Sequence, residues 1–204
     1  MDQALAQLEE LIVTLELHPG SVWSEAELCQ MLGIGRTPVR EALKRLESEH
    51  LVETIPRYGV KITEINPQDQ LLLLETRGVL ERLVVISAAR RATEPEREQC
   101  VQMAVTLLSM VDSDVREFLR YHYYIKRVVA EMARNPYTAG ALMPFYAISR
   151  RFYYMHHLRT KDVPLAAKYH ANILRAIAKR DEVQAANASD LLIDYAVQIA
   201  KASA

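Results

Sequence analysis

Cysteine is scarce in this chain of 204 residues, which contains only Cys29 and Cys100. Neither has a second thiol at the short spacing that metal knuckles and redox pairs use. A disulfide scaffold also needs more cysteines than these two. We therefore expect both to be reduced, packed side chains without a disulfide between them.

Long apolar runs are missing as well. Charged residues interrupt every apolar stretch before it reaches a membrane-spanning length, and the N-terminus lacks the basic flank and apolar core of a secretory signal. The sequence thus predicts a soluble, cytoplasmic protein that is not embedded in a membrane. Its length exceeds one typical compact domain and favours one small and one medium domain.

Net charge is nearly absent too, with 25 basic and 26 acidic residues, so the total neither indicates nor excludes nucleic acid. The distribution is more informative. Residues 1–65 carry eleven acidic side chains and only six basic ones, and the basic ones all fall in one stretch: Arg36, Arg40, Lys44, Arg45, Arg57 and Lys61. The cations are thus concentrated in one part of an otherwise acidic segment.

Capping and turn signals divide this first segment into three helices. Apolar residues at spacings of three and four predict a helix over 4–17. Residues 24–27 have the form of a capping box that opens a second, short helix. Thr37 and Pro38 supply a capping hydroxyl and a first-turn proline, which predicts a third helix that runs to about His50.

Two short β-rich runs follow, at 51–55 and 60–63, and residues 56–59 join them as a hairpin in which Gly59 permits positive φ. Three helices followed by such a hairpin predict a winged helix-turn-helix in residues 1–66.

From Asn66 and Pro67 onward the pattern is helical, without a credible strand or glycine-rich loop. Caps and breaks predict six helices, at roughly 67–92, 95–110, 114–134, 137–158, 163–179 and 182–202. The predicted fold class is therefore mainly α, with an N-terminal winged helix-turn-helix and a C-terminal antiparallel helical bundle over residues 67–204.

The third predicted helix has the two faces that a DNA-recognition helix needs. Val39, Leu43 and Leu46 form an apolar face at spacings of four and three. Another face carries basic side chains at a spacing of four: Arg36, Arg40 and Lys44. Such spacing alone is typical of a solvated surface. Its combination with two capped helices, a tight glycine turn and a wing favours DNA binding.

Each DNA-binding candidate has a chemical reason. Arg40 can read guanine O6 and N7 in a bidentate fashion, and Thr37 lies at a helix start whose free amides can meet a phosphate. Arg57 and Gly59 of the wing suit the minor groove or the backbone. We expect the following residues to contact DNA: Arg36, Thr37, Arg40, Lys44, Arg45, Arg57, Tyr58 and Gly59.

These residues resemble the DNA-binding domain of the GntR family of regulators. The resemblance covers nearly all of residues 5–65 and is carried by Pro19-Gly20, Glu25 to Leu28, Leu32 to Ile34, Arg36 to Leu43, Leu46, Leu51-Val52 and Gly59. Two positions depart from it: Gly35 replaces the usual serine or threonine, and His50 stands where glycine is frequent. The first departure removes a hydroxyl that could contact a phosphate.

Residues 68–202 resemble, more loosely, the FCD type of effector domain in the FadR-like subgroup of that family. The matching residues are Arg77, Leu80-Glu81, Asn135-Pro136, His170, Ile173-Leu174, Ala176-Ile177 and Asp181. The resemblance implies an antiparallel bundle with a cavity for a small ligand, often a carboxylate, and a homodimer.

Many members of that group hold a metal with an Asp-x-x-x-His pair and two later histidines. The four corresponding positions here hold His122, Lys126, His170 and Leu192, so one usual ligand remains. We expect no metal or other cofactor, because the lysine ammonium would repel a divalent cation and could stand in for its charge toward an anionic ligand. The alternative is a reduced site of His122, His170 and one of the pair His156 and His157.

The residues that we expect to bind an acidic effector are Arg77, His122, Lys126, Arg151 and His170. Tyr123, Tyr124 or Tyr154 would form walls of the site. Alternatively, the tyrosine-rich stretches 121–124 and 152–154 pack a core, and Arg77 forms an internal ion pair with Glu81, four residues later.

Together these patterns predict a regulator rather than an enzyme. It would bind a double-stranded DNA operator as a homodimer and act as a repressor or an activator of transcription. A small acidic metabolite would change its affinity for the operator. One rival is a helical enzyme with an accessory DNA module, although no nucleophile–base pair or phosphate loop can be recognised. Another is an effector-independent regulator whose cavity is filled by tyrosine and methionine.

Overall fold

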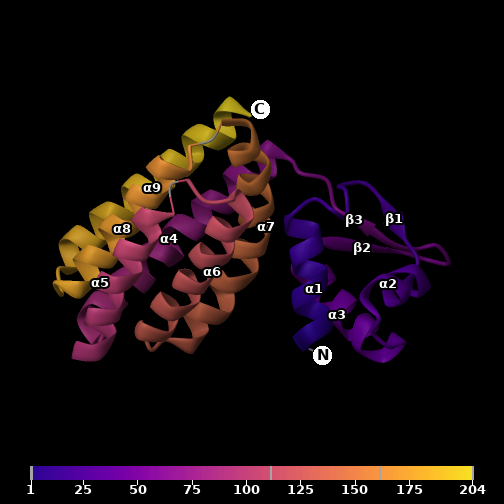
Figure 1. Cartoon of the computed structure of the whole chain (residues 1–204), viewed down its shortest axis with the longest axis horizontal. Coiled ribbons are helices and arrows are strands. Elements are labelled where there is room, and N and C mark those ends of the chain that lie inside the picture. Colours follow the sequence, from indigo (N-terminus) through magenta and orange to yellow (C-terminus); the bar gives the residue numbers. More distant parts are fainter. Residues whose placement is uncertain (1, 111, 161, 204) are drawn as a thin grey trace. The chain divides into compact units, whose positions relative to one another are not determined.

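A computed structural model describes residues 2–110, 112–160 and 162–203, and the chain forms two compact units. The first unit comprises Met1–Ile65 and Ala147–Met155, and the second comprises Asn66–Tyr146 and His156–Ala204. Figure 1 labels the helices and strands of both.

The first unit has the secondary structure of a winged helix-turn-helix. Its elements are α1 (Asp2–Val13), β1 (Val22–Trp23), α2 (Glu25–Leu32), α3 (Arg36–Ser48), β2 (Val52–Ile55) and β3 (Gly59–Ile62). The strands form an antiparallel sheet in the order β1-β3-β2. The three helices and the hairpin confirm the sequence prediction. β1 was not predicted, because a strand of two residues is too short to show a periodicity.

Apolar side chains from all three helices and the hairpin fill the core of this unit. Leu8, Leu28, Leu46 and Ile62 are completely buried there. The predicted capping box of α2 is present: the Glu27 amide donates to Ser24 Oγ over 3.2 Å, and the Ser24 amide donates to a Glu27 carboxylate oxygen over 2.7 Å.

Two predicted helix ends in this unit are wrong. α1 ends at Val13 rather than at residue 17, and Leu15 adopts a left-handed φ of 59°, which an α-helix cannot accommodate. α3 begins at Arg36, with Gly35 in the extended conformation of an N-cap. Thr37 is thus the second helical residue and not the cap. Pro38 is tolerated in the first turn because an amide there has no intrahelical partner.

Gly59 fixes the shape of the wing. Its φ of 121° confirms the expectation of a positive angle. A Cβ atom added there would lie 2.2 Å from the backbone oxygen of Trp23 in β1. Only glycine therefore allows β3 to start at this position beside β1.

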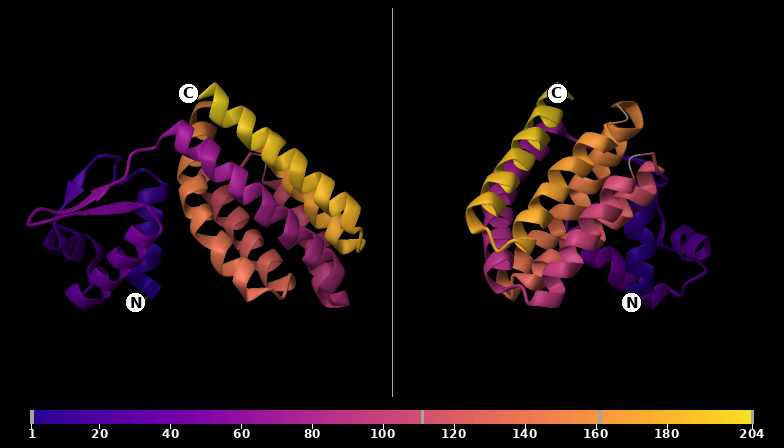
Figure 2. Two further views of the ribbon diagram at one scale, coloured as in Figure 1. Left: turned by 180° about the vertical axis from the view of Figure 1, so that it is seen from behind. Right: turned by 60° about the vertical axis from the view of Figure 1, so that its left-hand side comes forward.

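The second unit consists of α-helices in its described part. They are α4 (Pro67–Arg91), α5 (Glu94–Ser109), α6 (Val115–Met132), α7 (Pro136–Thr160, of which Ala147–Met155 groups with the first unit), α8 (Val163–Ala178) and α9 (Glu182–Ala202). Their ends differ from the six predicted helices by at most two residues. α4 packs along α9, and α8 packs against both α5 and α9 (Figure 2). No helix of the described chain is both long and apolar enough to cross a bilayer.

A local capping signal accounts for the start of this unit. The Asn66 side chain accepts a hydrogen bond from the Gln68 amide over 2.8 Å, and Pro67 follows as the first helical residue, as predicted.

Cys29 and Cys100 are both free thiols. Cys100 is buried in α5, and this burial raises its pKa to about 12, so the thiol is neutral and inert.

Candidate nucleic-acid interface and helical cavity

Helix α3 separates apolar and cationic side chains, as its spacing predicted. Its buried residues are Val39, Ala42, Leu43 and Leu46, which anchor the helix to the first unit. The exposed residues of the same helix include Arg36, Thr37, Arg40, Lys44 and Arg45. The helix thus displays a basic surface on an apolar anchor, which is the arrangement that major-groove binding needs.

Arg40 is held in place by a neighbouring helix. Its Nη2 lies 2.7 Å and its Nε 3.1 Å from the carboxylate of Glu25 at the start of α2. The hydrogen bond from Arg40 lowers the pKa of Glu25. Because the Arg40 side chain is 57% exposed, water screens this pair and its exchange for another partner costs little.

Two further cations of this surface, Lys44 and Arg45, are also paired near their own positions. Lys44 Nζ lies 2.9 Å from Glu41, and Arg45 Nε lies 3.1 Å from Glu49. These contacts join residues three or four positions apart on the helix, so they order the cations without turning them inward.

The first turn of α3 adds backbone donors to the basic surface. Gly35 at the N-cap has no side chain to bond the free amides, and the amides of Arg36 and Thr37 precede the first intrahelical bond of the helix. Such amides, together with the positive end of the helix dipole, form a binding site for a phosphate.

The wing displays its candidate residues at the hairpin turn. Arg57 adopts a left-handed φ of 71°, which is unusual for a residue with a side chain, and Tyr58 is 75% exposed. Arg57 is exposed as well, so the turn presents one cation and one aromatic ring to the solvent.

A small cavity of about 20 Å³ lies inside the second unit, which is room for one water molecule. Its polar lining comes from four helices: Glu81 of α4, Lys126 of α6, Tyr146 of α7 and His170 of α8. Aliphatic side chains form the remainder of the wall.

Glu81 is the centre of a buried charge cluster beside the cavity. Arg77 Nε donates to its carboxylate over 3.0 Å, Lys126 Nζ forms a close ion pair with it, and the Tyr146 hydroxyl donates over 3.2 Å. Burial alone would raise the pKa of Glu81, but the charges of Arg77 and Lys126 outweigh burial and lower it to about 2. Two cations and one carboxylate give this cluster a net positive charge.

Two histidines lie next to this cluster, with ring centroids 3.9 Å apart. Burial, followed by neighbouring positive charge, lowers the pKa of both His122 and His170 well below the usual range, so both rings are neutral at pH 7. Within the described chain, neither ring nitrogen of His122 has a hydrogen-bond partner. A buried imidazole in this state favours a further polar group or water at the cavity.

The structure brings together four of the five predicted effector-binding residues. Lys126 and His170 line the cavity, His122 lies against His170, and Arg77 is joined to the cluster through Glu81. The internal ion pair of Arg77 and Glu81, which the sequence offered as an alternative, is thus present.

Arg151 is placed differently. Its guanidinium donates to the Thr63 backbone oxygen over 2.8 Å, to the Thr63 hydroxyl over 3.1 Å and to the Glu64 backbone oxygen over 3.2 Å, all within the first unit. It does not line the described cavity. A buried arginine and one that binds a ligand look alike in a sequence, because only the fold supplies the acceptors.

The tyrosine that lines the cavity is not one of the three that the sequence predicted. Tyr123, Tyr124 and Tyr154 are not among the lining residues, and Tyr124 is 47% exposed. The lining tyrosine is Tyr146, which sequence analysis missed because one tyrosine on an apolar helix face carries no signal of its own.

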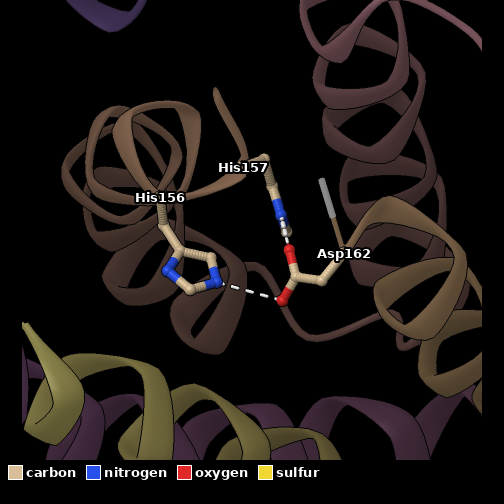
Figure 3. A group of neighbouring side chains, drawn as sticks. All are labelled: His156, His157 and Asp162. Atoms are coloured by element: carbon tan, nitrogen blue, oxygen red, sulfur yellow. Dashed lines mark hydrogen bonds and ion pairs between the residues drawn. The ribbon is translucent and has the colours of Figure 1, made fainter. Parts of the chain in front are cut away.

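The donors at the family's metal positions do not fit the usual metal. Lys126 is occupied by Glu81, and Leu192 is a buried aliphatic side chain without a donor atom. His156 and His157, one of which the reduced alternative would have placed with His122 and His170, both lie beside Asp162 (Figure 3).

Two family models match the chain. Residues 1–62 match the model described as bacterial regulatory proteins, gntR family, and residues 72–195 match the FCD domain. An uncharacterized HTH-type transcriptional regulator of Mycobacterium tuberculosis H37Rv is 26% identical over 189 residues, which cover 92% of this chain and 75% of that protein.

Other relatives match over a shorter part of the chain. An uncharacterized HTH-type transcriptional regulator from an unstable DNA locus of Streptomyces ambofaciens is 43% identical over 61 residues, 30% of this chain and 26% of that protein. The Bacillus subtilis regulator YdhC is 32% identical over 90 residues, 44% of this chain and 40% of that protein. The matched part is less than two thirds of the length of these two relatives.

Solved structures share the fold at low sequence identity. Escherichia coli McbR/YncC superposes with a TM-score of 0.85 at 17% identity, over 98% of this chain and 96% of that chain. A GntR transcriptional regulator from Rhodococcus sp. RHA1 gives 0.73 at 18% identity, over 97% and 96% of the two chains. At these identities the likeness establishes the fold alone.

Proposed function

The chain belongs to the GntR family of bacterial regulatory proteins and carries an FCD domain, and from this premise we propose that it controls transcription as an operator-binding homodimer in the cytoplasm. Residues 1–66 form the DNA-binding domain in this proposal, and residues 67–204 form the effector-binding and dimerisation domain. Two copies related by a two-fold axis would place their recognition helices on adjacent half-sites of a near-palindromic operator.

The observation that supports DNA binding most directly is the exposed basic side of α3 above its buried apolar anchor. Glu25 already holds Arg40 with its Nε and Nη2 pointing at two acceptor oxygens. The O6 and N7 atoms of a guanine offer a similar pair of acceptors, so Arg40 can exchange the carboxylate for a base. The amides of Arg36 and Thr37, and the wing residues Arg57 and Tyr58, would fix the register on phosphates.

For the second domain we propose a small carboxylate effector at the charge cluster. The cluster carries a net positive charge, and two of the predicted effector-binding residues, Lys126 and His170, line the cavity. Arg77 pairs with Glu81 of the cluster, and His122 lies against His170. Because the cavity holds no more than a water molecule as it stands, an effector has to separate the surrounding helices. Binding that favours a separated arrangement would shift the population between two states and so change operator affinity.

The small volume of the cavity favours a second candidate, a regulator that needs no effector. The two candidates differ in one measurable property, because a ligand that binds the folded state raises its thermal stability by mass action. A thermal-shift screen with small organic acids should therefore yield a selective stabiliser for the first candidate and none for the second.

DNA binding is tested by selecting bound sequences from a random duplex library and titrating the selected duplex by fluorescence anisotropy. We expect affinity to fall steeply with salt, because bound cations release counterions from the phosphates. Arg175→Ala, which removes an exposed arginine of α8, serves as the control and should bind the selected duplex as tightly as the wild-type protein. If the wild-type protein selects no sequence, or if the affinity is independent of salt, the proposal is wrong.

A further inference from the structure

Three side chains meet where α7 ends and α8 begins. His157 belongs to the last turn of α7 and His156 directly precedes it, and Asp162 is the N-cap residue of α8 (Figure 3). His156 Nε2 lies 3.0 Å from Asp162 Oδ2, and His157 Nδ1 makes a still closer contact with Asp162 Oδ1. One nitrogen from each ring and a carboxylate oxygen lie within 4.8 Å of one another.

Asp162 does not behave like the other capping aspartates of this chain. Asp114 accepts a hydrogen bond from the Arg116 amide over 2.7 Å, and Asp181 accepts one from the Gln184 amide over 2.9 Å, each within its own helix. The side chain of Asp162 makes no such bond to α8. Asp162 therefore does not make the capping hydrogen bond that usually explains an aspartate at this position.

The carboxylate turns toward the histidines instead, and further groups hold it there. Besides the two rings, it accepts a hydrogen bond from Thr160 Oγ1 over 3.0 Å and a close one from the Tyr195 hydroxyl of α9. The Tyr195 ring in turn stacks on Tyr169 of α8, with centroids 5.0 Å apart. Outer groups that orient a carboxylate and its histidines are typical of metal sites.

From this geometry we propose that His156, His157 and Asp162 bind a divalent transition-metal ion of the zinc class. Two imidazole nitrogens and a carboxylate oxygen are a donor set that such ions prefer, and three protein ligands leave a position for water. The ion takes the place of the hydrogens that lie between the rings and the carboxylate. A ring that donates one of these hydrogens shifts its proton to its other nitrogen, so each imidazole binds the ion in its neutral form.

This site is separate from the positions at which the family usually holds a metal. Those positions are His122, Lys126, His170 and Leu192, and they share no residue with the proposed site. His157 is almost completely buried, whereas His156 and Asp162 are partly exposed, so an ion can enter from the solvent side. Ligands from the end of α7 and the start of α8 would tie these two helices together.

The test uses full-length protein that has been stripped with a chelator and dialysed. Isothermal titration with Zn²⁺ alone should give one ion per chain, and Co²⁺ at the same site should give the visible absorption of a low-coordinate complex. Asp162→Asn and His156→Ala should each weaken Zn²⁺ binding on the order of 100-fold, and Tyr195→Phe by about 10-fold. His18→Ala, which removes an exposed histidine of the first unit, should leave binding unchanged.

Three results would overturn the proposal. The first is a wild-type protein that binds no stoichiometric Zn²⁺. The second is binding that survives unchanged in both Asp162→Asn and His156→Ala. The third is binding that persists in these variants and is lost in His170→Gln, which would place the ion at the cavity. Circular dichroism of each variant verifies the fold, and His156→Ala decides the outcome if Asp162→Asn does not fold, because the His156 ring is not fully buried.

Discussion

Each of the two units contains an arginine paired with a glutamate, and the two pairs differ in burial. Arg40 and Glu25 meet at the surface of the first unit, where the two side chains are 57% and 36% exposed. Arg77 and Glu81 meet inside the second unit, where both are 2% exposed. Water competes for the first pair and not for the second. The surface pair can therefore exchange partners, whereas the buried pair is part of the structure.

The sharpest test of this difference removes the glutamate from each pair. Glu81→Gln leaves Arg77 and Lys126 buried without their carboxylate, which should lower the free energy of unfolding by about 3–5 kcal/mol. Glu25→Gln should leave it unchanged within error, because the freed Arg40 is hydrated. Urea unfolding followed by circular dichroism measures both variants. Equal losses in the two variants would contradict the comparison.

The arginine of the surface pair should matter for DNA rather than for stability. Arg40→Ala should weaken binding to the selected duplex roughly 5- to 150-fold, the value of a lost bidentate contact to guanine. Glu25→Gln should instead tighten binding, because it removes a negative charge close to the phosphates. Anisotropy titration at fixed salt measures both. An unchanged affinity of Arg40→Ala would show that this arginine does not read the operator.

The buried region should also determine the response to acid. His122 and His170 have lowered pKa values when folded, so below pH 6.5 the unfolded chain binds protons that the folded chain does not. Stability should fall as the pH drops from 6.5, by at most about 1.4 kcal/mol per pH unit for each histidine. Glu81, whose folded pKa is about 2, adds a loss below pH 4.5.

Unfolding in urea at pH 7.5, 6.5 and 5.5 measures this dependence. His170→Gln removes one titrating ring and should flatten the profile, whereas His18→Ala, at an exposed position, should not. A wild-type profile that is flat between pH 6.5 and 5.5 would show that the two rings take up protons in the folded protein as readily as in the unfolded chain.

The smallest effect is expected at the start of the recognition helix. Gly35 has a φ of −66°, and a Cβ added there would meet nothing within 4 Å, so Gly35→Ser fits without strain. The hydroxyl would cap α3 and stabilise the protein by a few tenths of a kcal/mol. It would also add a phosphate contact, which anisotropy should detect as a gain in affinity of a few-fold. A loss of affinity would show that Gly35 is needed for close approach to DNA.

Much of the architecture was predictable because its signals are local. Ser24 with Glu27, and Asn66 with Pro67, mark helix starts through contacts between neighbouring residues, and these predictions are confirmed. The end of α1 was mispredicted because Leu15 continues the apolar spacing of the helix while its backbone has already left it. Leu17, which lies in a bend after the helix, is 1% exposed, so an apolar side chain can be buried from outside a helix as well as from within one.

The candidate site was predictable only in part. The two faces of α3 follow from a spacing that any reader of the sequence can see. The contacts of Glu81 cannot be predicted from spacing, because Lys126 lies 45 residues and Tyr146 lies 65 residues further along the chain. Two other contacts also join residues that are far apart in sequence: Thr63 lies 88 residues before Arg151, and Tyr195 lies 33 residues after Asp162.

The amino-acid sequence by itself thus determined the family, the order of the helices and the basic side of α3, because capping, periodicity and amphipathicity act over a few residues. The tertiary structure alone decided which charges are buried, which arginines remain at the surface, and which histidines face a carboxylate. The physical reason is that desolvation and pairing depend on residues that only packing brings together, and these decide whether a charge is available to a ligand.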